Sequence, residues 1–196
     1  MNTSPPLLTR RAALAGALAL AAAPAAPRPA RAQEAILGDD GIYRQPWFLE
    51  SFLELAEDLE EAQAEGKRFA LMFELRGCPF CRDIHLVNFA VPEVSAFVRE
   101  RFAILSLNLI GDREVTDFDG TRAPEKEIAA RYGVRFTPTI LFFPERAEGL
   151  GGLPPRQREV LRVVGYQEPE PFRRTFAFVA ERAYERTTLP DYLREG

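Results

Sequence analysis

The sequence is poor in the residues that build metal sites and disulfide scaffolds. Its 196 residues include two cysteines and one histidine. Two cysteines exclude a four-cysteine zinc site, and Cys78, Cys81 and His85 together have no obvious fourth metal ligand. The cysteines are separated by two residues, so a bond between them closes a tiny loop and stabilises the fold little through loop entropy. We therefore expect no disulfide scaffold, no metal and no other cofactor.

The sequence also lacks an apolar run long enough to span a membrane. Residues 12–23 are rich in Ala and Leu, but this run is about a dozen residues long, whereas a membrane-spanning helix needs roughly 20. A cationic segment precedes the run, and Ala30-Arg31-Ala32 follows it as a small-x-small cleavage site. These features predict a removable export signal over residues 1–32. A retained membrane anchor is the alternative.

The chain has no basic stripe. Arg10 and Arg11 lie directly before the apolar run, which resembles the twin-arginine export signal; a general secretory signal with two ordinary arginines is the alternative. Cleavage after Ala32 removes four of the 25 basic residues and none of the 29 acidic ones, so the mature net charge is −8. Such a surface is a poor match for nucleic acid. Either export route places the mature protein outside the cytoplasm.

Residues 33–196 are expected to form one domain of alternating helices and strands. The first helix is predicted over residues 47–64, where Phe48, Phe52, Leu55 and Leu59 recur at three- and four-residue spacing. Further helices are predicted over 78–88, 92–101, 124–132 and 171–185, and strands over 68–75, 102–109, 139–143 and 159–166. A polar connection rich in Gly and Asp occupies residues 110–121. This order predicts an α/β fold with a mixed central sheet flanked by helices.

Chemistry is expected at the Cys78-Pro79-Phe80-Cys81 motif, where a strand turns into a helix. A disulfide reductase needs one ionised thiol and a second thiol that releases the product. The N–H groups at a helix N-terminus stabilise a thiolate, so Cys78 is the expected nucleophile. Cys81 lies one helical turn further on and is the expected resolving thiol. A purely structural disulfide is the alternative.

Neighbouring residues are expected to support this pair. Arg76 and Arg82 bring positive charge close to Cys78, which favours a thiolate. Pro79 suits the first helical turn. Phe80 presents an apolar ring beside the exposed sulfur.

A second motif, Thr137-Pro138, lies at the start of an apolar strand. Proline cannot donate to a sheet ladder, so it marks a strand start or a cis turn. A trans proline that punctuates a loop is the alternative.

These two motifs together resemble the thioredoxin superfamily. More specifically, the segments QPWF (45–48), RGCPFC (76–81), NFA (88–90), GDREVTDFDG (111–120) and RFTPT (135–139) resemble the SoxW-type periplasmic thioredoxins of bacterial sulfur oxidation. The resemblance implies a thioredoxin fold with an N-terminal helix and an insertion between the CxxC helix and the cis-proline strand. It also implies that Cys78 attacks and Cys81 resolves. Pro138 would be a cis-proline that faces the cysteines, and the backbone of Thr137 would pair with the substrate.

The same resemblance implies a biological setting. The protein would be a periplasmic monomer that keeps the thiols of partner proteins reduced. Its electrons would come from a membrane thiol-reductant transporter. Its partners would be disulfide-bearing periplasmic proteins.

The sequence departs from the thioredoxin pattern at two places. Pro79-Phe80 replaces the usual Gly-Pro, so the reduction potential cannot be carried over. Met72 stands where thioredoxins place a buried aspartate. Glu74 has the same strand parity, and we hypothesise that it relays the proton of Cys81; pairing with a surface arginine is the alternative. His85 would tune Cys81 as a titrating neighbour, or lie at the helix boundary without a catalytic part.

Three functions remain open at the level of the sequence. The first is a reductase of protein disulfides. The second is an oxidase or isomerase of exported proteins, which uses the same residues in another direction. The third is a non-enzymatic redox-sensing module that binds a partner through Phe80 and the loop over residues 111–121; the aspartates of this loop lack the spacing of a calcium-binding EF-hand.

Overall fold

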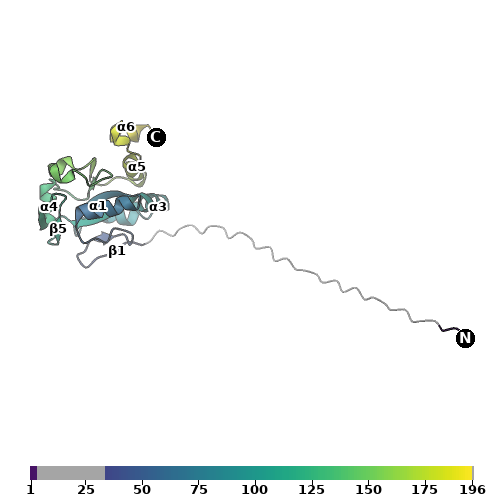
Figure 1. Ribbon diagram of the computed structural model, residues 1–196. Helices are drawn as coiled ribbons and strands as arrows, with labels where there is room; N and C mark the ends of the chain where they lie inside the picture. Colours follow the sequence, from purple (N-terminus) through teal and green to yellow (C-terminus); the bar gives the residue numbers. More distant parts are fainter. Residues whose placement is uncertain (4–33, 196) are drawn as a thin grey trace.

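The computed structural model describes residues 1–3 and 34–195 (Figure 1). Among these residues, the main sheet has four strands. The strand order is β4 (Phe102–Asn108), β3 (Arg68–Glu74), β7 (Thr139–Phe142) and β8 (Leu161–Val164). Strands β3 and β4 are parallel, whereas β7 is antiparallel to both β3 and β8. The predicted mixed sheet is confirmed.

Helices cover both faces of this sheet and give it three layers. Alternate residues of β3 point to opposite faces: Leu71 and Phe73 join one apolar cluster, and Ala70 and Met72 join the other. The first cluster also contains buried side chains of α1 (Leu55–Ala64) and α4 (Glu125–Arg131). The second contains those of α3 (Pro92–Arg101) and α5 (Pro169–Ala180).

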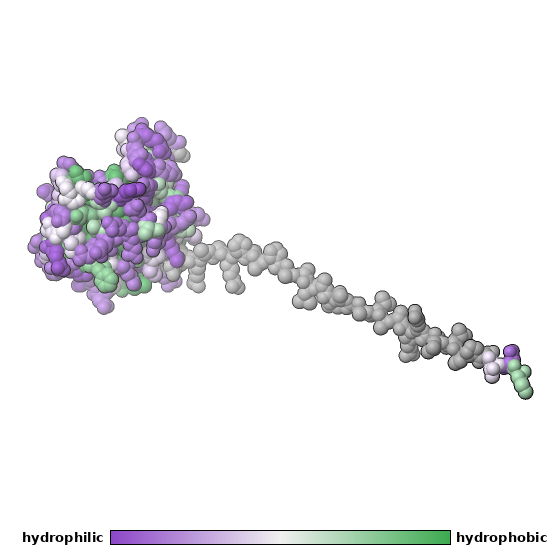
Figure 2. All heavy atoms as spheres, in the orientation of Figure 1, coloured by the Kyte–Doolittle hydropathy of each residue, from purple (hydrophilic) through white to green (hydrophobic). Residues whose placement is uncertain are grey.

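The surface is largely polar. The face drawn in Figure 2 is covered mostly by hydrophilic residues, with small scattered apolar areas. Among the described residues, no helix combines the length and apolar character needed to cross a membrane. Residues 4–33 lie outside the described part of the chain. The export signal over residues 1–32, with Arg10, Arg11 and cleavage near Ala32, therefore stays a prediction.

The first helix is shorter than the sequence predicts. It begins at Leu55, and residues 47–54 form turns and bends instead. Leu53 adopts a left-handed backbone conformation with φ 67°, which an α-helix of L-residues does not contain. Consequently Phe52 is 97% exposed, and Phe48 packs in the cluster on the opposite face of the sheet from Leu55 and Leu59.

The connections also contain structure that the sequence did not predict. A hairpin of β1 (Ile36–Leu37) and β2 (Tyr43–Arg44) precedes α1. The supposed polar connection contains β5 (Glu114–Thr116), which pairs with β6 (Arg122–Pro124). Helix α5 ends at Ala180 rather than residue 185, because Arg182 is left-handed with φ 55°, and α6 (Leu189–Arg194) follows.

Short helical turns complete the architecture. Helix α2 (Pro79–Asp83) follows Cys78 and continues directly into a π-helical turn, η1 (Ile84–Asn88). Phe89 N–H donates to the carbonyl oxygen of Ile84 at 3.0 Å, which is the i→i+5 bond of a π-helix. The predicted helix over residues 78–88 is therefore present, with a wider second half. Three 3₁₀ turns lie elsewhere: η2 (Leu150–Gly152), η3 (Pro155–Gln157) and η4 (Ala183–Glu185).

Candidate active site

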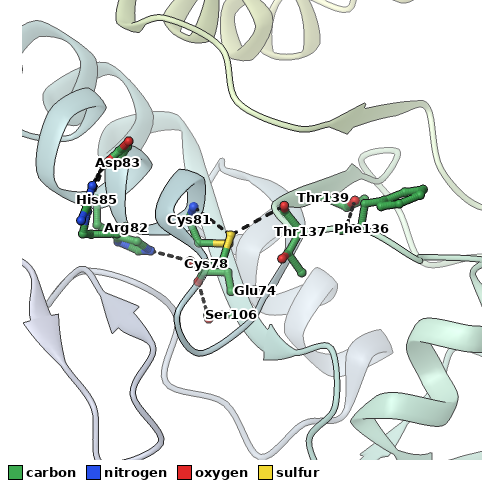
Figure 3. Close-up of a disulfide and its surroundings, with 10 residues drawn as sticks. All are labelled: Glu74, Cys78, Cys81, Arg82, Asp83, His85, Ser106, Phe136, Thr137 and Thr139. Carbon is green, nitrogen blue, oxygen red and sulfur yellow. Dashed lines mark hydrogen bonds and ion pairs between the residues drawn. A yellow bond between two sulfur atoms is a disulfide. The ribbon is translucent and has the colours of Figure 1, made fainter.

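A disulfide joins Cys78 and Cys81 at the point where β3 turns into α2 (Figure 3). Gly77 makes this turn with φ 75°, a conformation that favours glycine. Cys78 is the N-cap residue of α2, and its sulfur accepts a hydrogen bond from the backbone N–H of Cys81 at 3.2 Å. Cys81 is 4% exposed and Cys78 is half-buried. An incoming sulfur therefore has access to Cys78 rather than to Cys81.

Thr137 and Pro138 face this disulfide from the start of β7. The peptide bond between them is cis, as expected from the sequence. The carbonyl oxygen of Thr137 lies 3.7 Å from the sulfur of Cys78. Gly165 N–H donates to the carbonyl oxygen of Pro138 at 2.8 Å, which joins the segment to the end of β8. The structure thus brings together two motifs that are about sixty residues apart in the sequence.

Two exposed phenylalanines lie on the segments that carry Cys78 and Thr137. Phe80 is half-exposed and stacks on Tyr166, with ring centroids 6.0 Å apart. Phe136, next to Thr137, is 69% exposed. Tyr166 is fixed in turn, because its hydroxyl donates to Asn88 at 2.9 Å. Phe80 therefore adds an apolar ring within the motif itself, whereas the ring of Phe136 points away from the disulfide (Figure 3).

A buried polar cluster lies at the end of β3 beside this motif. Glu74 is 0% exposed, and its carboxylate contacts the Nε2 atom of His85 at 2.8 Å. The hydroxyl of Ser106 donates to the other carboxylate oxygen at 2.7 Å. The pairing of Glu74 with a surface arginine is therefore wrong. His85 lies just after the point where α2 passes into η1, and it is 2% exposed; its effect on Cys81 stays a prediction. Figure 3 draws this cluster with the disulfide.

The N-terminal segment holds His85 from its other side. The amide of Gln45 donates to the backbone oxygen of His85 at 3.1 Å and lies 3.5 Å from its Nδ1 atom. The ring of Tyr43 stacks on the imidazole, with centroids 6.4 Å apart. Sequence reasoning missed Tyr43, Gln45 and Ser106. Ser106 carried a signal as a polar residue within an apolar strand, and Gln45 stands in the QPWF segment.

The two arginines next to the cysteines have other partners. Arg76 Nε donates to the backbone oxygen of Asp40 at 2.8 Å, and Arg82 pairs with Asp83 at 2.9 Å. Their predicted effect on the thiolate stays a prediction. Among the described residues, no group of three His, Cys, Asp or Glu side chains is placed to hold a metal ion.

Comparison with solved structures finds thioredoxin folds. A thioredoxin-fold protein from Helicobacter pylori is 21% identical over 66% of this chain and 84% of its own, with a TM-score of 0.49. A thioredoxin from Thermus thermophilus is 27% identical over 64% of this chain and 83% of its own, with a TM-score of 0.47. The oxidised C-terminal domain of DsbD from Neisseria meningitidis is 16% identical over 66% and 96%, with a TM-score of 0.43.

Comparison with families is more direct. No curated protein matches the chain. The model of the thioredoxin-like domain matches residues 55–180, which is more than half of the chain and includes both cysteines and Pro138. The β1–β2 hairpin and Gln45 lie before the matched range. On this match, the chain belongs to the thioredoxin-like domain family.

Proposed function

We propose that the protein is a thiol-disulfide oxidoreductase that reduces protein disulfides through Cys78 and Cys81. One observation carries this proposal: a disulfide joins a half-buried cysteine at a helix N-terminus to a buried cysteine one turn later, and the accessible sulfur faces Thr137. A structural staple would not need one sulfur to be accessible.

The reaction begins from the dithiol. The Cys78 thiolate attacks one sulfur of a substrate disulfide, forms a mixed disulfide and releases the other substrate sulfur as a thiolate. Cys81 then loses its proton and attacks the sulfur of Cys78, which releases the second substrate thiolate. The products are a reduced substrate and the Cys78–Cys81 disulfide. The Cys81 N–H that points at the sulfur of Cys78 supplies a hydrogen bond that stabilises the attacking thiolate.

The surface around Cys78 supports binding of a protein substrate. The carbonyl oxygen of Thr137 is directed at the reacting sulfur, so an extended substrate backbone that donates to this segment would hold its own disulfide against Cys78. Phe80, which is 54% exposed, would cover apolar side chains beside that disulfide. This arrangement favours a protein as the substrate.

Glu74 and His85 supply the proton chemistry of Cys81 in this proposal. Glu74 lies four residues before Cys78, His85 lies four residues after Cys81, and the two side chains contact each other in the protein interior. A carboxylate held in this position accepts the proton that Cys81 must lose before it attacks. The hydroxyl of Ser106 fixes the carboxylate by bonding its second oxygen.

The setting of this activity follows from the resemblance stated above. We propose a periplasmic protein of the SoxW-type subgroup, monomeric, with an export signal over residues 1–32 and one thioredoxin-like domain over residues 33–196. Its substrates would be disulfide-bearing periplasmic proteins, and a membrane thiol transporter would supply its electrons. The alternatives remain a disulfide oxidase or isomerase, and a module that binds without catalysis.

Insulin reduction by dithiothreitol tests the proposal. Cys78→Ser is expected to abolish the catalysed rate. Cys81→Ser is expected to leave a mixed disulfide between Cys78 and the substrate, visible by non-reducing electrophoresis and mass spectrometry. Full activity of Cys78→Ser would contradict the proposal. If a variant with both Cys78→Ser and Cys81→Ser retains the biological effect of the protein, the non-catalytic module is favoured instead.

The direction of the reaction needs a second measurement. Equilibration of the disulfide with glutathione gives its reduction potential. A reductase is expected near the value of thioredoxin, about −270 mV, and an oxidase near about −120 mV. A value at the oxidising end would replace reductase by oxidase while leaving the roles of Cys78 and Cys81 unchanged.

A further inference from the structure

A small pocket adjoins the disulfide and is separate from the Thr137 segment. Its volume is about 150 Å³, and both cysteines form part of its wall. Gly41, Ile42 and Tyr43 form the opposite wall. None of the residues 136–138 lines it. The disulfide is therefore accessible from a second direction, in addition to the surface next to Thr137.

This second wall comes from the chain's own N-terminal segment. The β1–β2 hairpin lies before the residues matched by the thioredoxin-like family model, which begin at residue 55. Two contacts fix the hairpin beside the motif: Arg76 Nε donates to the backbone oxygen of Asp40 at 2.8 Å, and the ring of Tyr43 stacks on His85. The pocket is thus a feature that the hairpin adds to the domain.

The volume of the pocket limits what it can hold. A water molecule in the liquid takes up about 30 Å³, so the pocket has room for a group about the size of five waters. A peptide segment could place no more than about one side chain in that space. A thiol with a handful of heavy atoms does fit, and the wall of the pocket places such a molecule against the disulfide.

The charge around the pocket favours an anion. Arg82 lines the pocket, and its guanidinium forms an ion pair with Asp83. The side chain of Arg76 lies against Gly41 in the opposite wall. Within the described part of the chain, Arg76 donates only to a backbone oxygen and pairs with no carboxylate. The nearby carboxylate of Asp40 is itself paired with Arg44, so one positive charge is left without a counter-charge.

We propose that this pocket binds a small anionic thiol that reduces the Cys78–Cys81 disulfide, as a second electron source beside the membrane thiol transporter, an inference that rests on the proposed oxidoreductase function. The thiolate of the bound molecule attacks the sulfur of Cys78, a bond forms between these two sulfurs, and the bond to Cys81 breaks. Cys81 leaves as a thiolate and takes up a proton. A second thiol molecule then attacks the ligand sulfur of the mixed disulfide and releases the Cys78 thiolate. Two small thiols are oxidised to one small disulfide, and the protein disulfide is reduced.

Three thiols of similar size and different charge test this site. The oxidised full-length mature protein is mixed with thioglycolate, 2-mercaptoethanol or cysteamine, and its free thiols are counted over time by alkylation and mass spectrometry. Each rate is divided by the rate of the same thiol with hydroxyethyl disulfide, which removes differences in intrinsic thiol reactivity. We expect thioglycolate to be favoured over cysteamine at least about tenfold. We also expect its rate to saturate with concentration.

Variants separate the pocket from general reactivity. Arg76→Gln and Arg82→Gln together are expected to reduce the charge preference to about threefold or less, because both guanidinium groups are removed. Arg122→Gln is the matched control, since Arg122 pairs with Glu114 on the surface of the β5–β6 sheet, and it should retain the full preference.

The outcomes distinguish this inference from the proposed function. Three results would each overturn the small-thiol site: a thioglycolate-to-cysteamine ratio near one, a thioglycolate rate that does not saturate, or a charge preference that survives the double arginine variant. Absence of insulin reduction with dithiothreitol in the unmodified protein would instead overturn the oxidoreductase proposal. A saturable anion preference that the double variant removes would support the site.

Discussion

At the scale of single residues, Glu74 occupies an unusual position for a carboxylate. It is fully buried, yet both of its oxygens have partners, His85 on one side and Ser106 on the other. Burial of a carboxylate is costly unless its hydrogen bonds are satisfied. Because Glu74 ends the strand that leads into the cysteine motif, a role in the reaction can be tested on this residue.

We predict that Glu74→Gln slows the resolving step rather than the first attack. Glutamine has nearly the same shape and keeps a hydrogen-bonding oxygen for Ser106, but it cannot accept a proton. General base catalysis typically contributes about 10²–10⁴-fold to a rate. We therefore expect mixed disulfides to accumulate and the pH dependence of insulin reduction to change.

The matched control for this variant is Asp117→Asn, which alters a buried carboxylate that contacts Tyr132 and Arg158 instead. It should lower stability without moving the pH profile. An unchanged pH dependence of turnover in Glu74→Gln would show that Glu74 relays no proton.

Asp58 in helix α1 gives a pH effect on stability rather than on turnover. Burial and the nearby carboxylates of Glu61 and Glu57 raise its pKa to about 6, while the hydroxyl of Ser51 donates to it at 2.7 Å and opposes this rise. The folded state therefore holds this proton more tightly than the unfolded state does. Its contribution to stability is present at low pH and is lost as the pH rises from about 4 to about 6.

We predict that Asp58→Asn increases the free energy of unfolding at pH 7.5 by roughly 1 to 2 kcal/mol, because the amide needs no proton to stay uncharged. At pH 4, where Asp58 is protonated in the folded state, the variant and the parent should differ little. Urea unfolding at both pH values measures this. Equal effects at the two pH values would mean that the titration of Asp58 is not responsible.

At the scale of elements, the sequence predicted the strands and motifs that depend only on a short local segment. The apolar strands were placed within one residue at β3 and β4, since buried strands are continuous apolar runs bounded by polar turns. The cysteines and Pro138 were also found from local sequence, because each lies in a short motif. The start of α1 was misplaced, because the left-handed conformation of Leu53 leaves no signal in an apolar residue.

The contact between Glu74 and His85 depended on structure that no single segment contains. Ser106 reaches Glu74 through the register of two parallel strands, in which Ser106 is the partner of Met72. His85 reaches Glu74 from a π-helical turn, and Gln45 approaches from the N-terminal segment. Sequence reasoning identified Glu74 and His85 separately but had no means to pair them.

Another buried ionic cluster lies remote in sequence from the cysteines, between the β5–β6 turn and the segment before β8. The side chain of Arg158 is 1% exposed and lies 2.8 Å from the carboxylate of Asp117, which also accepts a hydrogen bond from Tyr132 at 2.8 Å. Arg158 further contacts Asp119 at 3.0 Å. The cluster joins the turn after β5 to the segment that leads into β8.

We predict that Arg158→Ala lowers the free energy of unfolding by about 2–4 kcal/mol, because the buried carboxylate of Asp117 loses one of its two cations and keeps only Arg131 at 3.2 Å. The exposed neighbour Arg156 is the matched control, and Arg156→Ala should cost no more than about 0.5 kcal/mol. Urea unfolding of both variants measures the difference. Equal stability of the two variants would mean that solvent reaches Asp117 and replaces the cation.

At the scale of the whole molecule, the redox state and the fold are linked in one thermodynamic cycle. The unfolded chain forms the Cys78–Cys81 disulfide with an ordinary potential for two cysteines three positions apart. Any difference between this potential and that of the folded protein must appear as a difference in stability between the oxidised and reduced forms. The direction of the reaction in the cell can therefore be read from unfolding experiments that involve no substrate.

We predict that the oxidised protein is more stable to urea than the reduced protein, because a reductant gives up electrons readily only when folding favours its disulfide form. A strong oxidant shows the opposite order, since its reduced form is stabilised. For this two-electron couple, a stability difference of about 1.4 kcal/mol corresponds to about 30 mV. The Cys78→Ser variant should show no effect of added reductant, which controls for effects of the reductant itself. Greater stability of the reduced form would assign the protein to the oxidase class, because the fold would then drive electrons onto Cys78 and Cys81 rather than away from them.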